Sequence, residues 1–180
     1  MIKQISIFIL SSTFLMFSCA DSTKSSSKKT ELKERIKTYE DSLMALQKDP
    51  QKALKITSLA QIELINRLTA YSRAFPSDNY SAVCLFKTHM IYENLRAPLE
   101  ARAYADTLLE RFPNFKQRKL VLESLASSYD MNSPRDTSKV RLYFELLLKE
   151  PGIDAERKKD IKERLKHLEL TFEEYIMQMP

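Results

Sequence analysis

The fold of this chain is decided by residues 75–113, which read FPSDNYSAVCLFKTHMIYENLRAPLEARAYADTLLERFP. The segment begins and ends with Phe-Pro, and Pro98 divides it into two stretches that carry apolar residues at helical spacing. Proline is accepted in the first turn of a helix but disrupts its interior, so each stretch forms a separate helix. The segment therefore predicts a hairpin of two helices.

The same breaks recur along the chain. Phe75-Pro76 is followed by Phe112-Pro113 after 37 residues, and Glu150-Pro151 comes 38 residues after that. Tyr92 likewise returns as Tyr129 after 37 residues. One helical hairpin cannot bury its own apolar face, so repeated hairpins stack and share a continuous core. The spacing predicts a solenoid of helical hairpins with additional capping helices.

The rest of the chain carries similar helical signals. Amphipathic stretches predict helices over residues 31–48, 51–75, 116–129, 138–149 and 154–167, and a capping box at residues 171–174 begins a short last helix. Asp160 lies one helical turn before Arg164, so we expect these two side chains to form an ion pair. No stretch shows the sustained alternation of a half-buried strand, and the predicted class is therefore all-α.

The composition excludes several classes of function. Gly152 is the only glycine, whereas phosphate-binding loops, dinucleotide-binding folds and serine nucleophile elbows need several. The 29 basic and 24 acidic residues are mixed along the predicted helices, without a basic groove that contains aromatic residues. We therefore expect no nucleic-acid partner.

The first residues have the pattern of a targeting segment. Lys3 precedes an uncharged stretch over residues 5–17, which is too short to span a bilayer comfortably and is typical of a signal-peptide core. The stretch ends in Ser18-Cys19, and a small residue directly before a cysteine resembles the lipobox of bacterial lipoproteins. This resemblance implies cleavage after Ser18 and a lipid on the Cys19 thiol. An ordinary secretory peptide in which Cys19 is incidental is the alternative.

Three regions follow from these patterns. Residues 1–18 are predicted to be a lipoprotein signal peptide, and the polar, serine-rich residues 19–30 a lipidated flexible tether. Residues 31–180 are predicted to form the helical repeat domain.

The hairpin of residues 75–113 resembles a tetratricopeptide repeat. Leu85 and Tyr92 correspond to the large apolar and aromatic residues of the first helix in such a repeat. Ala101 corresponds to the packing alanine of the second helix, and Pro113 to the closing proline. The resemblance implies a tetratricopeptide-like solenoid.

Over residues 50–176 the chain resembles the tetratricopeptide lipoproteins of Bacteroidetes outer membranes, especially in the closing segment RLKHLELTFEEYI at residues 164–176. It is more remotely similar to the lipidated repeat protein of the β-barrel assembly machine. His89 departs from the family, which has a small residue there, and Arg96 lies near the usual turn glycine.

The resemblance implies a non-enzymatic lipoprotein that is anchored in the outer membrane through Cys19. Asp21 is the only acid before Lys24, whereas related lipoproteins exported to the cell surface carry an acidic cluster here, so the domain is expected to face the periplasm. There it would scaffold another envelope protein, such as an outer-membrane β-barrel or its assembly machinery. The alternatives are an envelope enzyme acting on peptidoglycan, a surface-exposed binding lipoprotein and a structural role within a barrel complex.

The first helices of tetratricopeptide repeats line a concave face. By the resemblance, the partner-binding face here consists of Val83, Phe86, Met90, Glu93, Asn94, Leu120, Glu123 and Ser127. The alternative for Phe86 and Met90 is that they belong to the core.

Few side chains suggest catalysis or metal binding. His89 and Glu93 lie one helical turn apart, but no third ligand accompanies them, so we predict a packed histidine, no metal site and no cofactor. No motif indicates a catalytic triad. Cys84 lies beside Leu85 on an apolar helix and is predicted to be buried and inert, with an intermolecular disulfide as the alternative.

The lipobox generates a prediction about Cys19. The variant Cys19→Ala should lose labelling by radioactive fatty acid and remain unprocessed or soluble, because the acylated thiol is gone. The variant Cys84→Ala is the matched control and should be labelled normally. If Cys19→Ala still matures and fractionates with the outer membrane, the lipoprotein assignment is wrong.

Overall fold

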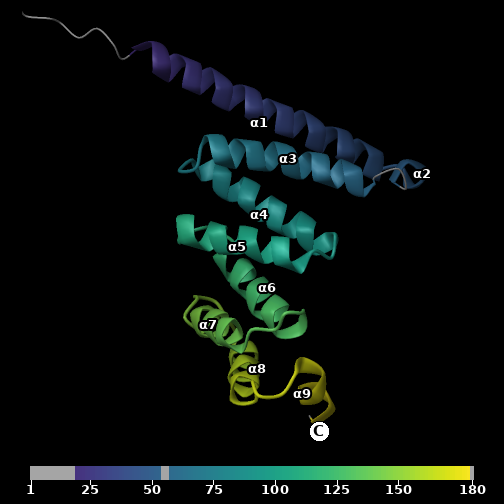
Figure 1. The fold of residues 1–180 in the computed structure, drawn as a ribbon, viewed down its shortest axis with the longest axis vertical. Coiled ribbons are helices and arrows are strands. Elements are labelled where there is room, and N and C mark those ends of the chain that lie inside the picture. Colours follow the sequence, from purple (N-terminus) through teal and green to yellow (C-terminus); the bar gives the residue numbers. More distant parts are fainter. Residues whose placement is uncertain (1–18, 54–56, 179–180) are drawn as a thin grey trace, which may run out of the picture.

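The computed structural model describes residues 19–53 and 57–178. In these residues the chain forms nine α-helices and no strand, which confirms the predicted all-α class (Figure 1). The helices are α1 (Cys19–Gln47), α2 (Pro50–Ala53), α3 (Ser58–Ala74), α4 (Asn79–Asn94), α5 (Pro98–Arg111), α6 (Arg118–Met131), α7 (Thr137–Leu148), α8 (Ala155–Lys166) and α9 (Phe172–Gln178). The predicted signal peptide lies outside the described residues. Among the helices described, none combines the length and the apolar character that a membrane span requires.

Most helix boundaries fall where the sequence predicts them. Asp78 caps α4, and its side chain accepts a hydrogen bond from the Tyr80 amide at 2.9 Å. Pro98 is the first residue of α5, and Phe75 and Phe112, which precede Pro76 and Pro113, are the C-cap residues of α3 and α5. The capping box is also confirmed, since the backbone amide of Thr171 donates to Glu174 at 2.8 Å and that of Glu174 to Thr171 Oγ1 at 3.2 Å.

The N-terminal boundary of the ordered domain differs from the prediction. Residues 19–30 were expected to be a flexible tether, but they form the first part of α1. Neither glycine nor proline interrupts the chain between Cys19 and Asp49, so the helix can continue toward its N-terminus. Lys29 and Lys33 also form ion pairs with Asp78 at the start of α4, which holds α1 before residue 31.

The helix predicted over residues 51–75 is also corrected. Thr57 has an extended backbone with φ −86° and ψ 166°, and α3 begins only at the next residue. The Thr57 hydroxyl accepts a hydrogen bond from the Ala60 amide at 3.4 Å. Threonine is better suited to capping a helix than to its interior, so Thr57 starts a separate helix.

The helices follow one another along the long axis of the molecule, and α4 packs on α5 as α6 packs on α7 (Figure 1). Buried positions of α4 recur 37 residues later in α6, where Cys84, Leu85, Thr88 and His89 correspond to Val121, Leu122, Leu125 and Ala126. Buried positions of α5 recur 39 residues later in α7, where Ala101, Ala105 and Leu108 correspond to Val140, Phe144 and Leu147. The second spacing is larger because the α6–α7 connection is two residues longer than the α4–α5 connection.

The turn between α4 and α5 contains a residue with an unusual backbone conformation. Arg96 has φ +56°, in the left-handed region that favours glycine. An arginine thus occupies a turn position that favours glycine, and its Cβ adds strain there.

Two apolar clusters form the core. One joins α1, α3 and α4 through Ile36, Leu68, Tyr71 and Cys84. The larger one extends from α4 to α8 and includes Leu85, Leu122, Leu147 and Ile161. Because the clusters draw on different faces of α4, this helix joins the N-terminal and C-terminal halves of the domain.

The close approach of α4 and α5 generates a prediction about Ala101, which is 0% exposed. Ala101→Glu should lower the free energy of unfolding by about 3 kcal/mol or more, because it buries an unpaired carboxylate. Ala103 is exposed on the same helix, so Ala103→Glu should change it by less than about 0.5 kcal/mol. Urea denaturation followed by circular dichroism measures both, and equal effects would show that α5 does not pack as described.

Candidate functional site

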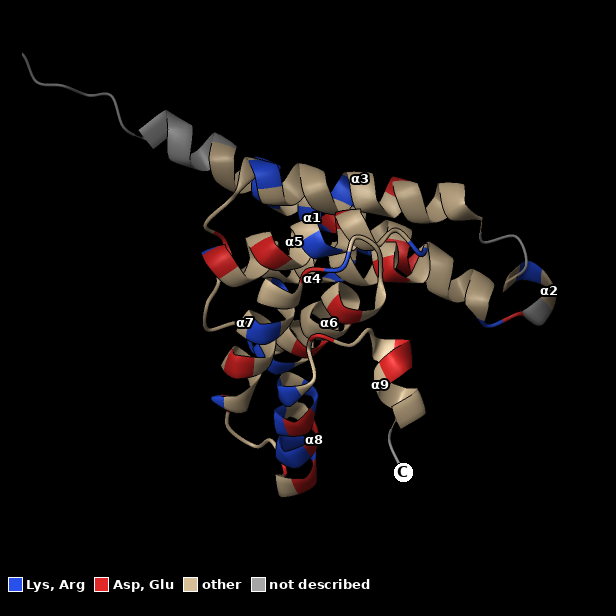
Figure 2. Cartoon of the chain, turned by 60° about the horizontal axis from the view of Figure 1, so that its bottom comes forward, with Lys and Arg blue, Asp and Glu red and all other residues tan. Residues whose placement is uncertain are grey.

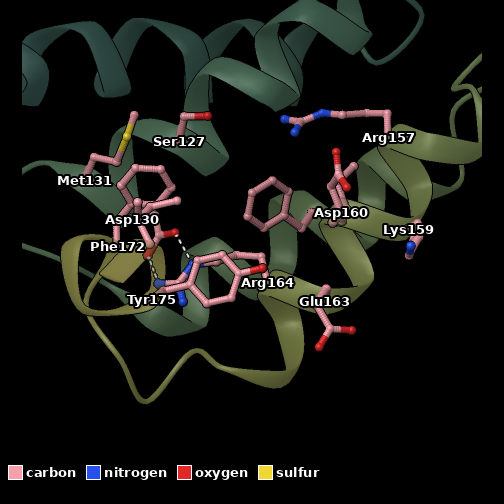
Figure 3. A pocket seen from close by; sticks show the side chains of 13 residues that line it. Ser127, Asp130, Met131, Arg157, Lys159, Asp160, Glu163, Arg164, Phe172 and Tyr175 are labelled. Carbon is pink, nitrogen blue, oxygen red and sulfur yellow. Dashed lines mark hydrogen bonds and ion pairs between the residues drawn. The ribbon is translucent and has the colours of Figure 1, made fainter. Parts of the chain in front are cut away.

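A pocket of about 570 Å³ lies among α6, α7, α8 and α9 (Figure 3). Its apolar lining comes from Met131, Phe144, Ile161, Phe172, Tyr175 and Ile176, so all four helices contribute. Met131 and Ile176 are 48% and 51% exposed, which gives the pocket an apolar rim in contact with water. Binding of an apolar group over this rim would be favourable, because it would remove apolar surface from water.

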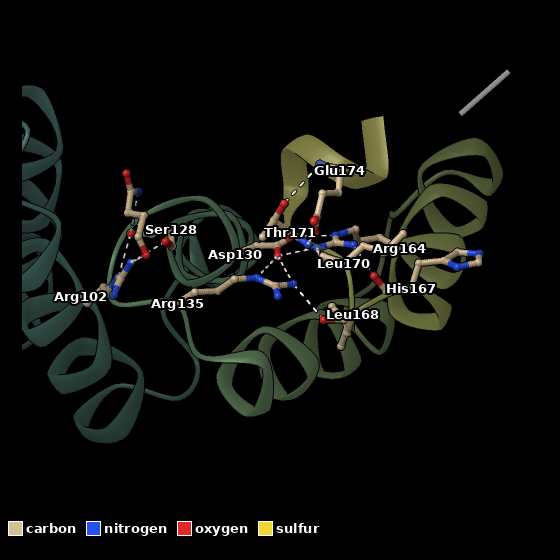
Figure 4. A network of polar contacts seen from close by, with 11 residues as sticks. Arg102, Ser128, Asp130, Arg135, Arg164, His167, Leu168, Leu170, Thr171 and Glu174 are labelled. Atoms are coloured by element: carbon tan, nitrogen blue, oxygen red, sulfur yellow. Dashed lines mark hydrogen bonds and ion pairs between the residues drawn. The ribbon is translucent and has the colours of Figure 1, made fainter. Parts of the chain in front are cut away.

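A buried ion pair lies beside this pocket (Figure 4). Asp130 at the end of α6 accepts hydrogen bonds from Nε and Nη2 of Arg164 on α8, both at 2.7 Å. Both side chains are almost fully buried. Arg135 adds hydrogen bonds of 3.1 and 2.9 Å to the same carboxylate. Two guanidinium groups thus compensate the burial of one carboxylate, and bidentate geometry makes the Arg164 pair strong.

Arg164 also organises the connection from α8 to α9. Its Nη1 donates to the His167 carbonyl at 2.6 Å, and its Nη2 to the Leu170 carbonyl at 2.9 Å. The guanidinium lies over the Tyr175 ring at 4.8 Å from the ring centroid. Arg164 therefore fixes α8 to α6 and positions α9 at the edge of the pocket.

This arrangement corrects the predicted ion pair between Asp160 and Arg164. Arg164 pairs with Asp130 instead, while Asp160 is exposed and lines the pocket without an ion pair to any described residue. An exposed pair one helical turn apart contributes only a few tenths of a kcal/mol. The buried site offers bidentate contacts in a drier environment, which favours Asp130.

A second contact joins α6 and α8 at another side of the pocket. Glu123 Oε1 accepts a hydrogen bond from Arg157 Nε at 2.9 Å, and it forms an ion pair with Arg157 Nη2 at 2.6 Å. Arg157 lines the pocket, and Glu123 of the same chain compensates its charge.

The residues of the predicted partner-binding face divide into two groups. In α6, Ser127 lines the pocket, Glu123 lies at its edge through Arg157, and Leu120 is exposed. The residues of the predicted face that belong to α4 do not line this pocket. They are Val83, Phe86, Met90, Glu93 and Asn94. The structure therefore does not bring the two groups together in one pocket. Phe86 packs on Phe115, with 5.5 Å between ring centroids, and contacts the larger core cluster, which agrees with the core alternative.

Sequence reasoning missed the residues that complete the site. Asp130 and Met131 follow the predicted face residues Glu93 and Asn94 by 37 positions, so applying the repeat to the whole face would have found them. Tyr175 and Ile176 follow a recognised capping box, but the docking of α9 had no local signal.

His89 is packed in the core, as predicted. Its Nδ1 donates to the Ala101 carbonyl at 3.0 Å, and burial lowers the pKa of the imidazole, so the ring is held neutral. Its Nε2 and Glu93 Oε1 are buried without a hydrogen-bond partner among the described residues. In the described part of the chain, no group of three or more His, Cys, Asp or Glu side chains could hold a metal ion.

Cys84 of α4 is fully buried, as the sequence predicts, and it packs with residues of α1 and α3. Burial raises the pKa of its thiol to about 12, which keeps the sulfur protonated and unreactive at neutral pH.

Comparison with known proteins finds no match among family models, curated proteins or solved structures.

The choice of ion-pair partner generates a prediction. Asp130→Ala should lower the free energy of unfolding by about 3–5 kcal/mol, because it leaves the buried Arg164 charge uncompensated. Asp160→Ala is the matched control and should change it by less than about 0.5 kcal/mol. Both values come from urea denaturation. A larger effect of Asp160→Ala than of Asp130→Ala would show that the helical pair predicted from the sequence is the true one.

Proposed function

We propose that this protein is a non-enzymatic scaffold, and that it binds an apolar segment of a partner protein in the pocket between α6 and α9. The observation that carries the proposal is the composition of the pocket: six large apolar side chains line it, and two of them are half exposed at its rim. When a partner covers an apolar surface of this kind and excludes water from it, the free energy of the complex is lowered.

Several charged groups of the pocket are engaged by other side chains, which supports binding rather than catalysis. Asp130 is engaged by two arginines, and Arg157 by Glu123. Glu163 accepts a hydrogen bond from Lys166 at 2.7 Å, and this contact lowers the pKa of the Glu163 carboxyl. These side chains hold helices together or remain ionised, whereas a general acid or base needs a pKa near the working pH. The apolar lining is what the pocket offers to a partner.

The wider architecture is consistent with a scaffold. The recurrence of buried positions from α4 to α6 and from α5 to α7 supports a tetratricopeptide-like solenoid, in which the helices before α4 and after α7 act as caps. Stacked hairpins of this kind present extended surfaces to other proteins. Lysines, arginines and acidic residues are mixed over the same helices in the described part of the chain (Figure 2).

We place the scaffold at the outer membrane, with Cys19 as its lipid anchor and the domain in the periplasm. The lipobox-like Ser18-Cys19 and the scarcity of acids after it support this placement. The partner is then another envelope protein, such as an outer-membrane β-barrel or its assembly machinery. Because α1 is helical from Cys19, an acylated Cys19 would hold the domain on a helical stem that rises about 15 Å before Lys29.

Site-specific photocross-linking in intact cells tests the proposed function. A benzophenone side chain at Met131 or Ile176 should give one discrete protein adduct, because both positions lie at the rim of the pocket. Leu99 on α5 and Leu142 on α7 are similarly exposed but do not line the pocket, so they serve as matched controls without that adduct. Equal adducts from all four positions, or none from Met131 and Ile176, would contradict the proposal.

A further inference from the structure

We infer that α9 is a lid on this pocket, which opens while α6, α7 and α8 remain folded. The regulatory role of the lid rests on the proposed function, because it concerns access of a partner to the same pocket. The movement itself depends only on the contacts of α9 within this chain.

The helix α9 is weakly held. It has seven residues, and Tyr175 is its only buried side chain. Ile176 is half exposed and Met177 is 81% exposed, so part of the apolar surface of the helix remains in water. A helix of this length is not stable alone and depends on its docking contacts. Segments with few buried contacts open at a lower free energy than the whole domain.

The docking contacts of α9 are concentrated at Tyr175. The Tyr175 ring lies against the Arg164 guanidinium, at 4.8 Å (Figure 3). It is also stacked with the His167 ring, with 5.9 Å between the ring centroids. Arg164 also donates a hydrogen bond to the Leu170 carbonyl, which lies just before the capping box. These contacts involve Tyr175 at the middle of α9 and Leu170 just before the helix, whereas Met177 near its C-terminal end is exposed.

Movement of α9 away from the pocket need not disturb the rest of the site. Arg164 holds Asp130 through two hydrogen bonds that do not involve α9, so α8 stays fixed on α6 when Tyr175 leaves. Movement of α9 removes the wall formed by Phe172, Tyr175 and Ile176. The closed pocket then becomes a longer groove along α6 and α8, with Phe144 and Ile161 at its base. A partner segment would compete with α9 for these apolar side chains.

Hydrogen–deuterium exchange of the full chain, followed by mass spectrometry, tests the lid. The amides of residues 175–178 should exchange at least about a hundredfold faster than those in the middle of α8, since they open locally. Tyr175→Ala should speed exchange in α9 by a further tenfold or so, without a change in α6, α7 or α8. Met177→Ala is the matched control on the same helix and should change α9 exchange by less than about twofold.

A second variant guards against misfolding. Tyr175→Leu keeps an apolar side chain but removes the stacking on Arg164 and His167, so it should also speed exchange in α9 alone. The inference is overturned if α9 and α8 exchange at the same rate in the native chain. It is also overturned if both Tyr175 variants speed α6–α8 as much as α9. Because no partner is present in this measurement, its outcome is independent of the cross-linking result.

Discussion

The bidentate ion pair of Asp130 and Arg164 joins residues that are 34 positions apart, and the C-terminal third of the domain is arranged around it. Both side chains are shielded from water, so neither charge can be left without the other at low cost. Arg135 completes the cluster and also donates to the Leu168 carbonyl at 3.0 Å. The position of α8, the path of the chain into α9 and the walls of the pocket all depend on this cluster.

Carboxylates play a similar joining role elsewhere in the fold. Asp78 accepts a hydrogen bond from the Tyr71 hydroxyl at 2.9 Å and pairs with lysines of α1, which links α1, α3 and α4. Asp106 of α5 accepts hydrogen bonds from Tyr129 of α6 and Tyr143 of α7. Burial together with these carboxylates raises the pKa of the Tyr71 and Tyr143 hydroxyls, which stay protonated as donors. Stacked hairpins thus gain orientation from polar contacts in addition to their shared apolar core.

Local sequence signals predicted the helices of this fold. The features that these signals missed depend on contacts between residues far apart in the chain. Prolines and caps such as Asp78 act within one helical turn, so the helix boundaries could be inferred from neighbouring residues. The extension of α1 over residues 19–30 depends partly on Asp78, far along the chain. The choice of Asp130 over Asp160 by Arg164 likewise requires α6 and α8 to be stacked first. The repeat resemblance indicated Ser127 as a binding residue. It did not indicate Tyr175, because the docking of α9 depends on contacts with α8 that have no local signal.

The Asp130–Arg164 pair holds α8 and α9 on α6 and thereby builds the pocket. A double-mutant cycle with Asp130→Ala, Arg164→Ala and the double variant tests it most directly, using the free energy of unfolding in urea. The account predicts a coupling energy of about 2–3 kcal/mol, because the second truncation removes a charge that the first has already left uncompensated. Effects of the single variants that add to within about 0.5 kcal/mol would contradict it.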